Sequence, residues 1–204
     1  MVYSLAFSLP GTPVLFYGEE IGMAENLSIE GRYSVRAPMQ WSGERQADFT
    51  TAAKPSRPLV EHGPFGFPEV NVARQRRDPN SLLNWMERLI RRRRECPELG
   101  WGDWTLLDSG DPAVFAHRSD WDGSTVVATH NLAGRDASAR LELEGDGALI
   151  DLFHDEDHQL EDGGVTLELP PYGGRWYRVR RPGQRLPPRG VSARSRGRRC
   201  AWRH

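Results

Sequence analysis

A single short apolar run, from Val14 to Tyr17, constrains the fold of this chain more than any other feature. It follows a Pro-Gly-Thr-Pro turn and is apolar at four consecutive positions before Gly18, as is typical of a parallel strand covered by helices on both faces. A lone strand of this kind would have two unpaired edges and two uncovered faces. We therefore expect residues 1–99 to be the C-terminal part of a larger α/β unit whose other strands lie in a preceding segment.

A long segment with little periodicity follows this run. From Glu19 to about Arg77, glycine, proline, serine and asparagine are frequent. A loop of that length in a compact domain is usually functional or disordered. The aromatic residues and the segment 36–41, RAPMQW, favour a functional loop.

The next pattern is that of one amphipathic helix. The segment 78–81, DPNS, offers an N-cap with proline at the first helical position. Apolar residues then recur at helical spacing: Leu82, Leu83, Met86, Leu89 and Ile90. Residues 91–94 are four arginines, which suit the negative end of the helix dipole, and Cys96-Pro97 ends the helix. A solvated last turn explains these arginines more simply than a nucleic-acid site does.

Short β-type runs separated by turn residues begin after Gly100. They are 104–107, 113–118, 125–129, 139–143, 148–152, 165–169 and 176–179. Asp-Gly pairs separate several of them, as in β-hairpins. We expect residues 100–180 to form an antiparallel β-sandwich, so the predicted fold class is α/β plus all-β.

The net charge of −1 conceals a basic end. Eight of the 27 basic residues and none of the 28 acidic residues lie at or after Arg181, so 19 basic and 28 acidic residues give residues 1–180 a charge of −9. An acidic body does not attract polyanions, so nucleic acid is not the expected partner, although binding through the arginine-rich end stays open. Residues 181–204 cannot bury a core, and we expect them to be a disordered basic tail.

The two cysteines and the opening segment bear on location. Cys96 and Cys200 lie far apart, and neither belongs to a CxxC pair, so no disulfide framework or zinc motif is indicated. We expect a reducing, cytoplasmic location. The opening lacks a basic n-region and is interrupted by proline and glycine at 10–13, so we expect buried structure rather than a signal or membrane span.

Several ionisable residues suggest chemistry but have simpler structural explanations. Glu19 and Glu20 are adjacent, and neighbours leaving a strand point to opposite faces, whereas catalysis by paired carboxyls needs them about 5 Å apart across one bond. We expect them to accept hydrogen bonds where the strand ends. The run 154–158, HDEDH, is expected to be a solvated turn rather than a metal site. His117 and His130 lie on predicted strands and are expected to be packed or hydrogen-bonded.

Three ordered segments resemble glycoside hydrolase family 13, the α-amylase superfamily. Residues 8–23, SLPGTPVLFYGEEIGM, resemble its last barrel strand. Residues 31–41, GRYSVRAPMQW, are similar to the arginine-rich loop of its trehalose synthase and oligo-1,6-glucosidase branches. Residues 70–75 and 78–83 resemble the entry to the eighth barrel helix. The resemblance implies the C-terminal end of a (β/α)8 TIM barrel, followed by the C-terminal β-sandwich of this family.

The resemblance also implies an activity on α-glucosidic bonds. Enzymes of this family are retaining, with an aspartate nucleophile, a glutamate acid and a second aspartate. By the resemblance these residues precede Met1, so no catalytic residue is expected here and the chain alone is expected to be inactive. The activity indicated is that of trehalose synthase, which isomerises maltose to trehalose, with hydrolysis by an α-glucosidase or α-amylase as the alternative. Maltose or another α-glucoside is the implied partner, and no cofactor or metal is implied.

One substrate-binding residue carries over from the family, Arg32. It matches the arginine that pairs with an upstream aspartate and holds the non-reducing glucose, a task that suits a guanidinium fork. Tyr33 stands where the family usually has aspartate, and Ala37 where it has threonine. Arg36 is expected to brace the loop.

A different class of function stays open. The predicted sandwich could be a non-catalytic carbohydrate-binding module with tryptophans as stacking residues, although tryptophan in a small sandwich more often belongs to the core. The candidates are Trp101, Trp104, Trp121 and Trp176.

Overall fold

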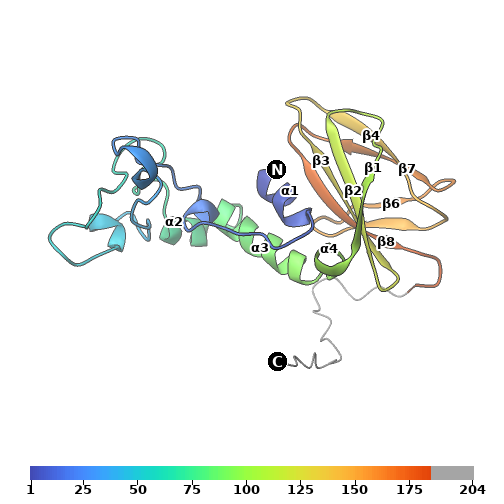
Figure 1. The fold of residues 1–204 in the computed structure, drawn as a ribbon, viewed down its shortest axis with the longest axis horizontal. Helices are drawn as coiled ribbons and strands as arrows, with labels where there is room; N and C mark the ends of the chain where they lie inside the picture. The colour runs from blue at the N-terminus through green and yellow to red at the C-terminus, as the bar shows by residue number, and fades with distance from the viewer. Residues whose placement is uncertain (185–204) are drawn as a thin grey trace, which may run out of the picture. The chain divides into compact units, whose positions relative to one another are not determined.

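The computed structural model describes residues 1–184 (Figure 1). They form two compact units, which are described separately: residues 13–90, and residues 1–12 together with the chain from Arg91 onward. Of the predicted basic tail, residues 185–204 lie outside the described residues. Arg181 to Gln184 form a turn in which the Gln184 N–H donates to the Arg181 carbonyl at 3.0 Å, so the ordered chain continues past the predicted end of the sandwich.

The helices of the described chain are short except for one. They are α1 (Val2–Ser8), α2 (Val72–Arg77), α3 (Leu82–Arg94) and α4 (Glu98–Trp101), with 3-10 turns η1 (Glu19–Ile21), η2 (Gly31–Tyr33) and η3 (Arg45–Asp48). None of the helices among residues 1–184 has the length and apolar character needed to cross a membrane.

The unit of residues 13–90 is irregular chain around a small apolar core. Buried Ile21, Met39 and Val72 form this core, and partly buried Met23, Val70 and Leu83 pack against it. Gln75, in α2, ties the loop to α3: its side-chain nitrogen donates to the Ile21 carbonyl at 2.7 Å, and its Oε1 accepts from the Leu83 N–H at 3.0 Å. One amide thus satisfies a loop carbonyl and a first-turn helix N–H that has no partner within its own helix.

Helix α3 begins three residues later than the predicted start. Ser81 caps it, because its Oγ accepts from the Asn84 N–H at 3.3 Å. The Asp78 carboxylate instead accepts from the Asn80 N–H at 2.9 Å, which closes a separate turn and makes the predicted start at Pro79 wrong. The predicted apolar face is confirmed at Met86 and Leu89, which are buried, and the helix ends at Arg94 as expected. Ile90, also predicted on this face, is 37% exposed.

The predicted buried strand from Val14 to Tyr17 does not form in this chain. No strand occurs within residues 13–90 of the described chain, and Val14 is 87% exposed, while Phe16 and Tyr17 are 45% and 46% exposed. A parallel strand needs hydrogen-bonding neighbours on both edges. With no other strand in this unit, the segment stays irregular.

The other unit contains two antiparallel sheets. Its strands are β1 (Asp103–Leu107), β2 (Val114–Trp121), β3 (Ser124–Asn131), β4 (Ala137–Glu142), β5 (Ala148–Asp151), β6 (Asp157–Gln159), β7 (Gly164–Leu169) and β8 (Gly174–Arg180). One sheet has the order β1-β2-β3-β8-β5-β6, and the other pairs β4 with β7. Figure 1 shows the pair β4 and β7 lying over the larger sheet.

The core of this unit lies between the two sheets. Along β4, buried and exposed residues alternate, so that Ala139 and Leu141 face inward, as expected for a strand with one covered face. Leu141 and Leu167 of the small sheet join Val127 and Tyr177 of the large sheet in one buried cluster. The predicted antiparallel β-sandwich is therefore confirmed.

The sequence predicted the turn between β2 and β3 correctly but did not predict strand β6. Asp122 and Gly123 have φ values of 49° and 74° and join β2 to β3, as a two-residue turn of the predicted kind requires. Strand β6, by contrast, was predicted as part of a solvated turn. It pairs with the edge of β5, and its three polar residues carry no apolar alternation that would have revealed it.

Helix α1 packs on the larger sheet through paired polar side chains. Ser4 Oγ lies 3.0 Å from His130 Nε2, and Ser8 Oγ lies 3.0 Å from His117 Nε2. Arg93 holds the end of α1, since its guanidinium donates to the carbonyls of Phe7, Leu9 and Gly11. Ser4, Phe7 and Ser8 are buried, so the expected buried opening is confirmed for one face of α1, whereas Val2 is 67% exposed.

Candidate functional site

The unit of residues 13–90 contains a hollow of about 360 Å³ with an aromatic wall. Its lining residues are Tyr17, Glu20, Arg36, Pro38, Met39, Trp41, Phe49, Ser56 and Arg57. Apolar and aromatic side chains supply most of this lining, and three charged groups interrupt it. A concave surface with this mixture is the usual form of a small-molecule site.

Hydrogen bonds to the backbone hold the walls of this hollow. The Gln40 side chain is fully buried and donates to the Val70 carbonyl, while its backbone carbonyl accepts from the Val72 N–H at 3.0 Å. Tyr17 Oη donates to the Ala37 carbonyl at 3.0 Å. These bonds tie residues 37–40, of which Pro38 and Met39 line the hollow, to Tyr17 and to the start of α2.

Glu19 and Glu20 serve the turn that borders the hollow. Gly18 has a φ of 91°, and its N–H donates to Glu20 Oε2 at 2.7 Å. The Phe16 N–H donates to Glu19 Oε2 at 3.3 Å. The predicted hydrogen-bonding role of both carboxylates is confirmed, and Glu20 also lines the hollow.

Three guanidinium groups gather around the ring of Tyr33. Their Cζ atoms lie 4.2 Å (Arg57), 5.6 Å (Arg32) and 5.9 Å (Arg36) from the ring centroid, within the range of cation–π attraction. Arg36 and Arg57 also line the hollow, with Ser56 between Arg57 and the preceding proline. Three arginines of this unit therefore gather at one ring, and two of them also line its aromatic cavity.

The predicted substrate-binding residue, Arg32, lies in η2 and is exposed. It belongs to the group around Tyr33 but does not line the hollow, and its role in substrate binding stays a prediction. Arg36 was expected only to brace the loop, although it lines the hollow. Sequence reasoning missed Arg57, because no local pattern connects it with Tyr33, the residue it approaches.

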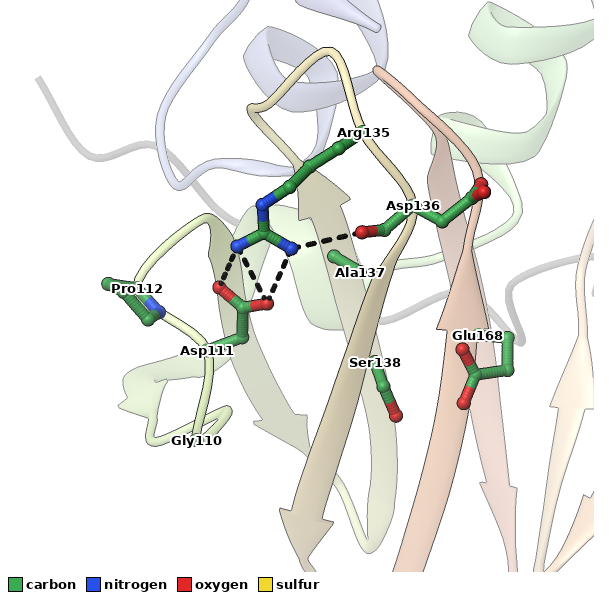
Figure 2. A pocket seen from close by; sticks show the side chains of 8 residues that line it. All are labelled: Gly110, Asp111, Pro112, Arg135, Asp136, Ala137, Ser138 and Glu168. Carbon is green, nitrogen blue, oxygen red and sulfur yellow. Dashed lines mark hydrogen bonds and ion pairs between the residues drawn. The ribbon is translucent and has the colours of Figure 1, made fainter.

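A second hollow, of about 590 Å³, lies on the sandwich (Figure 2). It is lined by Gly110, Asp111, Pro112, Arg135, Asp136, Ala137, Ser138 and Glu168. Arg135 Nη2 lies 3.1 Å from Asp111 Oδ1, and Figure 2 shows Glu168 beside Ser138 on the neighbouring strand. The Ala113 N–H and Arg135 lower the pKa of Asp111. No aromatic side chain lines this groove, so it is less suited to stacking on a sugar ring.

The acidic and histidine-rich run 154–158 forms no metal centre. Among residues 1–184, no group of three or more His, Cys, Asp or Glu side chains is arranged to hold a metal ion. His154 Nδ1 lies 3.3 Å from Asp151 Oδ1, and the His158 ring packs edge-on against Tyr177 with centroids 5.6 Å apart. These histidines serve local packing and turn structure.

His117 and His130 are fully buried on the sheet face that α1 covers. Burial lowers the pKa of His117 to about 4, with a smaller contribution from the charge of Arg93. Burial likewise lowers the pKa of His130 to about 3. Both rings are therefore neutral at physiological pH, and the expectation that they are packed and hydrogen-bonded is confirmed.

The tryptophans of the sandwich divide into exposed and buried residues. Trp176 is fully buried because it lies on β8, between β3 and β5, so the suggestion that it stacks on sugars is wrong. Trp101 and Trp121 are 75% and 44% exposed, with ring centroids 6.5 Å apart. Trp104 packs on the His117 ring at 5.7 Å. Only Trp101 and Trp121 form an exposed aromatic pair among these four.

Both parts of the chain match known domain families. Residues 1–102, half of the chain, match the catalytic domain of α-amylases. The chain belongs to the α-amylase family. Residues 123–178 of this family member match the C-terminal domain of sucrose hydrolase-like proteins, in agreement with the sandwich.

The curated relatives of this α-amylase family chain include enzymes named for reactions on sugars. The chain is 34% identical over 178 residues to trehalose synthase of Thermus thermophilus, and the match covers 85% of this chain and 18% of the relative. It is 27% identical over 215 residues to oligo-1,6-glucosidase of Halalkalibacterium halodurans, covering 87% of this chain and 37% of the relative. The chain thus spans well under half the length of these relatives.

Solved structures confirm the fold class. Isomaltulose synthase of Erwinia rhapontici, a mutant in complex with its natural substrate sucrose, matches with a TM-score of 0.68 and 19% identity, covering 88% of this chain and 37% of that one. With the two domain matches, this likeness supports the end of a (β/α)8 barrel followed by a β-sandwich. The family chain keeps that order even though its Val14 to Tyr17 segment forms no strand.

Proposed function

We propose that this chain is part of a retaining enzyme acting on α-glucosidic bonds, most like trehalose synthase, and that the hollow of residues 13–90 binds the α-glucoside. The observation that carries the proposal is the wall of Tyr17, Trp41 and Phe49 interrupted by charged groups. Sugar rings stack on aromatic faces, and their hydroxyls bond to charged side chains. The similarity to trehalose synthase and oligo-1,6-glucosidase supports maltose or a related α-glucoside as the substrate.

Arg32 is the proposed substrate-binding residue of this enzyme. Arg32 does not line the hollow itself, but its exposed guanidinium shares the Tyr33 ring with Arg36 and Arg57, which do. A sugar that extends beyond the hollow could bond to it, and a charged donor binds a hydroxyl more strongly than a neutral one. Calorimetric titration of the chain with maltose tests this role. We expect Arg32→Gln to weaken binding about tenfold, whereas Arg45→Gln, at an exposed arginine of the same unit, leaves it unchanged. Equal affinities for the wild-type and Arg32→Gln chains would remove Arg32 from the site.

The hollow by itself is equipped to bind rather than to cleave. Retaining chemistry needs two carboxyl groups about 5 Å apart, but Glu20 is the one carboxylate in the lining and it accepts from the Gly18 N–H. We therefore expect the 204-residue chain to bind maltose without converting it. Formation of glucose or trehalose by the purified chain would contradict this expectation.

Isomerisation rather than hydrolysis is the proposed reaction of the whole enzyme. In isomerisation the released glucose, rather than water, takes the glucosyl group, which requires a site closed to solvent. A protein that contains this chain together with a complete barrel is expected to form mainly trehalose from maltose. Glucose as the main product would instead assign the enzyme to the hydrolases.

A second candidate function rests on the exposed Trp101 and Trp121 pair. Two solvent-exposed indoles suit stacking on a glucan chain, so the sandwich could act as a carbohydrate-binding module. Retention of the whole chain by insoluble glucan, lost in Trp101→Ala and Trp121→Ala but kept in Leu132→Ala, would support this function. No retention would exclude it.

We also propose a cytoplasmic location, which the free, buried thiol of Cys96 supports, since structural disulfides are typical of oxidising compartments. The proposed domain boundary near residue 99 is supported by the α-amylase match, which ends at residue 102. The proposed sandwich domain, residues 100–180, includes the whole C-terminal-domain match at 123–178.

A further inference from the structure

Three consecutive non-glycine residues in η3 have left-handed backbone conformations. The φ values of Gln46, Ala47 and Asp48 are 55°, 54° and 52°. Positive φ is unfavourable for a residue with a side chain, because the Cβ atom crowds the following carbonyl oxygen. Elsewhere among residues 1–184, non-glycine residues with positive φ occur singly. A run of three persists only where the surrounding contacts hold it, and such strain is typical of binding sites.

The carbonyl of Ala47 ties this turn to the aromatic wall of the hollow. It accepts from the Trp41 N–H at 3.0 Å and from the Ser42 N–H at 3.2 Å. Ser42 Oγ in turn donates to Asp48 Oδ2 at 2.5 Å. Phe49 follows the turn directly, and both Trp41 and Phe49 line the hollow. The handedness of the turn therefore sets where the backbone presents these two rings.

Gln46 extends the link to a further part of the lining. Its Nε2 donates to the Ala52 carbonyl at 2.8 Å and to the Ala53 carbonyl at 3.1 Å. The chain continues from Ala53 to Ser56 and Arg57, which line the hollow. The turn thus connects the segments that carry separate parts of the lining.

Burial does not by itself fix the two rings. Trp41 and Phe49 are 46% and 43% exposed, whereas a core side chain is held by contacts on all sides. The backbone of the turn therefore has to hold the rings in position before a ligand arrives. A site that is formed in advance binds more tightly, because less conformational freedom is lost on binding.

We propose that Gln46, Ala47 and Asp48 are positioning residues of the α-glucoside site, because their left-handed turn holds Trp41 and Phe49 in place for stacking on the sugar. The three side chains do not line the hollow of the described unit, so they act through the rings. The ligand in this proposal rests on the proposed function, while the hold on Trp41 rests on the hydrogen bonds of the turn.

Substitutions of the exposed Asp48 separate backbone handedness from side-chain chemistry. Glycine, alanine and valine all remove the carboxylate that binds Ser42, but they tolerate positive φ in the order glycine, alanine, valine. In calorimetric titrations with maltose, we expect Asp48→Gly to bind within about twofold of the wild type, Asp48→Ala about threefold more weakly and Asp48→Val about tenfold more weakly. Because Asp48→Ala is the milder change, it keeps the comparison if Asp48→Val unfolds the unit.

The matched control is the same series of substitutions at Glu44, which is exposed and has a φ of −84°. Valine and alanine adopt this φ as readily as glycine does. The affinity for maltose should therefore not follow the glycine, alanine, valine order at Glu44.

Amide hydrogen exchange of Trp41 measures the hold of the turn without a ligand. Its N–H donates to the Ala47 carbonyl, so we expect it to be protected in the wild-type chain. Exchange should become progressively faster from Asp48→Gly through Asp48→Ala to Asp48→Val, because the left-handed turn opens more often in that order.

The outcomes separate the turn from the proposed function. Equal maltose affinities and equal Trp41 exchange rates in the three Asp48 variants would overturn the positioning role and leave the α-glucoside proposal intact. Ordered Trp41 exchange without maltose binding by any chain would support the hold on Trp41 and contradict the α-glucoside proposal. Affinities that follow the order of the variants while Trp41 exchange does not would overturn the hold of the turn on Trp41.

Discussion

Arg178 on β8 and Glu98 in α4 form a bidentate ion pair inside the sandwich unit. Arg178 Nε lies 3.1 Å from Glu98 Oε1, and Nη2 lies 3.2 Å from Oε2. The side chains are 11% and 2% exposed. Ser124 Oγ also donates to Glu98 Oε1 at 2.6 Å, so α4 is fixed to the sheet by a nearly buried polar network.

Breaking this pair is expected to be costly, because it leaves a guanidinium buried without its charge partner. We expect Glu98→Gln to lower the free energy of unfolding by about 3 kcal/mol or more, measured by urea denaturation followed by circular dichroism. The control is Glu142→Gln, whose pair with Arg140 is exposed and should be worth less than about 1 kcal/mol. If Glu98→Gln and Glu142→Gln lowered the free energy of unfolding by similar amounts, the buried pair would stabilise the unit no more than an exposed pair does, which would contradict this account.

The sandwich unit is expected to become less stable as the pH is lowered from about 6.5 to 4, because its buried histidines resist protonation. The folded state keeps the pKa of His117 near 4, below the ordinary value of 6.5, so the unfolded chain binds more protons between these values. The histidine contribution is therefore complete above about pH 6.5 and is lost as the pH falls towards 4. His117 alone should account for a loss on the order of 3 kcal/mol over this interval, and His130, whose pKa burial lowers to about 3, adds to it.

His117→Gln provides the matched control for this pH dependence. Glutamine can keep a hydrogen bond to Ser8 but does not titrate, so thermal melts of the variant should change less between pH 6.5 and 4 than those of the wild type. A native-state NMR titration in which His117 protonates near pH 6.5 would contradict the burial argument.

The thiol of Cys96 is expected to be unreactive in the folded chain. Burial, more than its neighbouring charges, raises its pKa to about 12, and thiolate is the reactive form. In a Cys200→Ser variant, a thiol reagent at pH 8 should label no cysteine until denaturant is added. Stoichiometric labelling of the native variant within minutes would show that Cys96 is accessible.

Gly18 and Gly31 allow backbone strain to be separated from steric overlap. Both have positive φ, but a Cβ on Gly18 would lie 2.9 Å from Met23 Sδ, whereas one on Gly31 would meet nothing within 4 Å. We expect Gly31→Ala to cost about 1 kcal/mol from backbone strain alone. Gly18→Ala should cost more, measured by chemical denaturation followed by circular dichroism. Equal costs would show that Met23 moves away without penalty.

The sequence predicted the sandwich well because its signals are local. The turn of Asp122 and Gly123 and the alternation along β4 both arise from neighbouring residues. The strand from Val14 to Tyr17 was predicted wrongly for the opposite reason. An apolar run forms a strand only when other strands supply its hydrogen bonds, and no strand occurs in residues 13–90 of the described chain.

The candidate site was predicted only in part. The segment 36–41 carried a recognisable pattern, so the loop that lines the hollow could be chosen in advance. Arg57 could not, because its approach to Tyr33 joins residues 24 positions apart in irregular chain, where no periodicity links them. The pairing of Ser4 with His130 was hidden for the same reason.

The α-glucoside site is tested most directly by the indole signals of the chain in a two-dimensional ¹H–¹⁵N NMR titration with maltose. We expect the Trp41 indole signal, assigned with a Trp41→Phe variant, to shift saturably with a dissociation constant on the order of 1 mM, while the Trp101 and Trp121 signals stay in place. Shifts confined to Trp101 and Trp121, or no shift at all, would contradict an α-glucoside site in the hollow of residues 13–90.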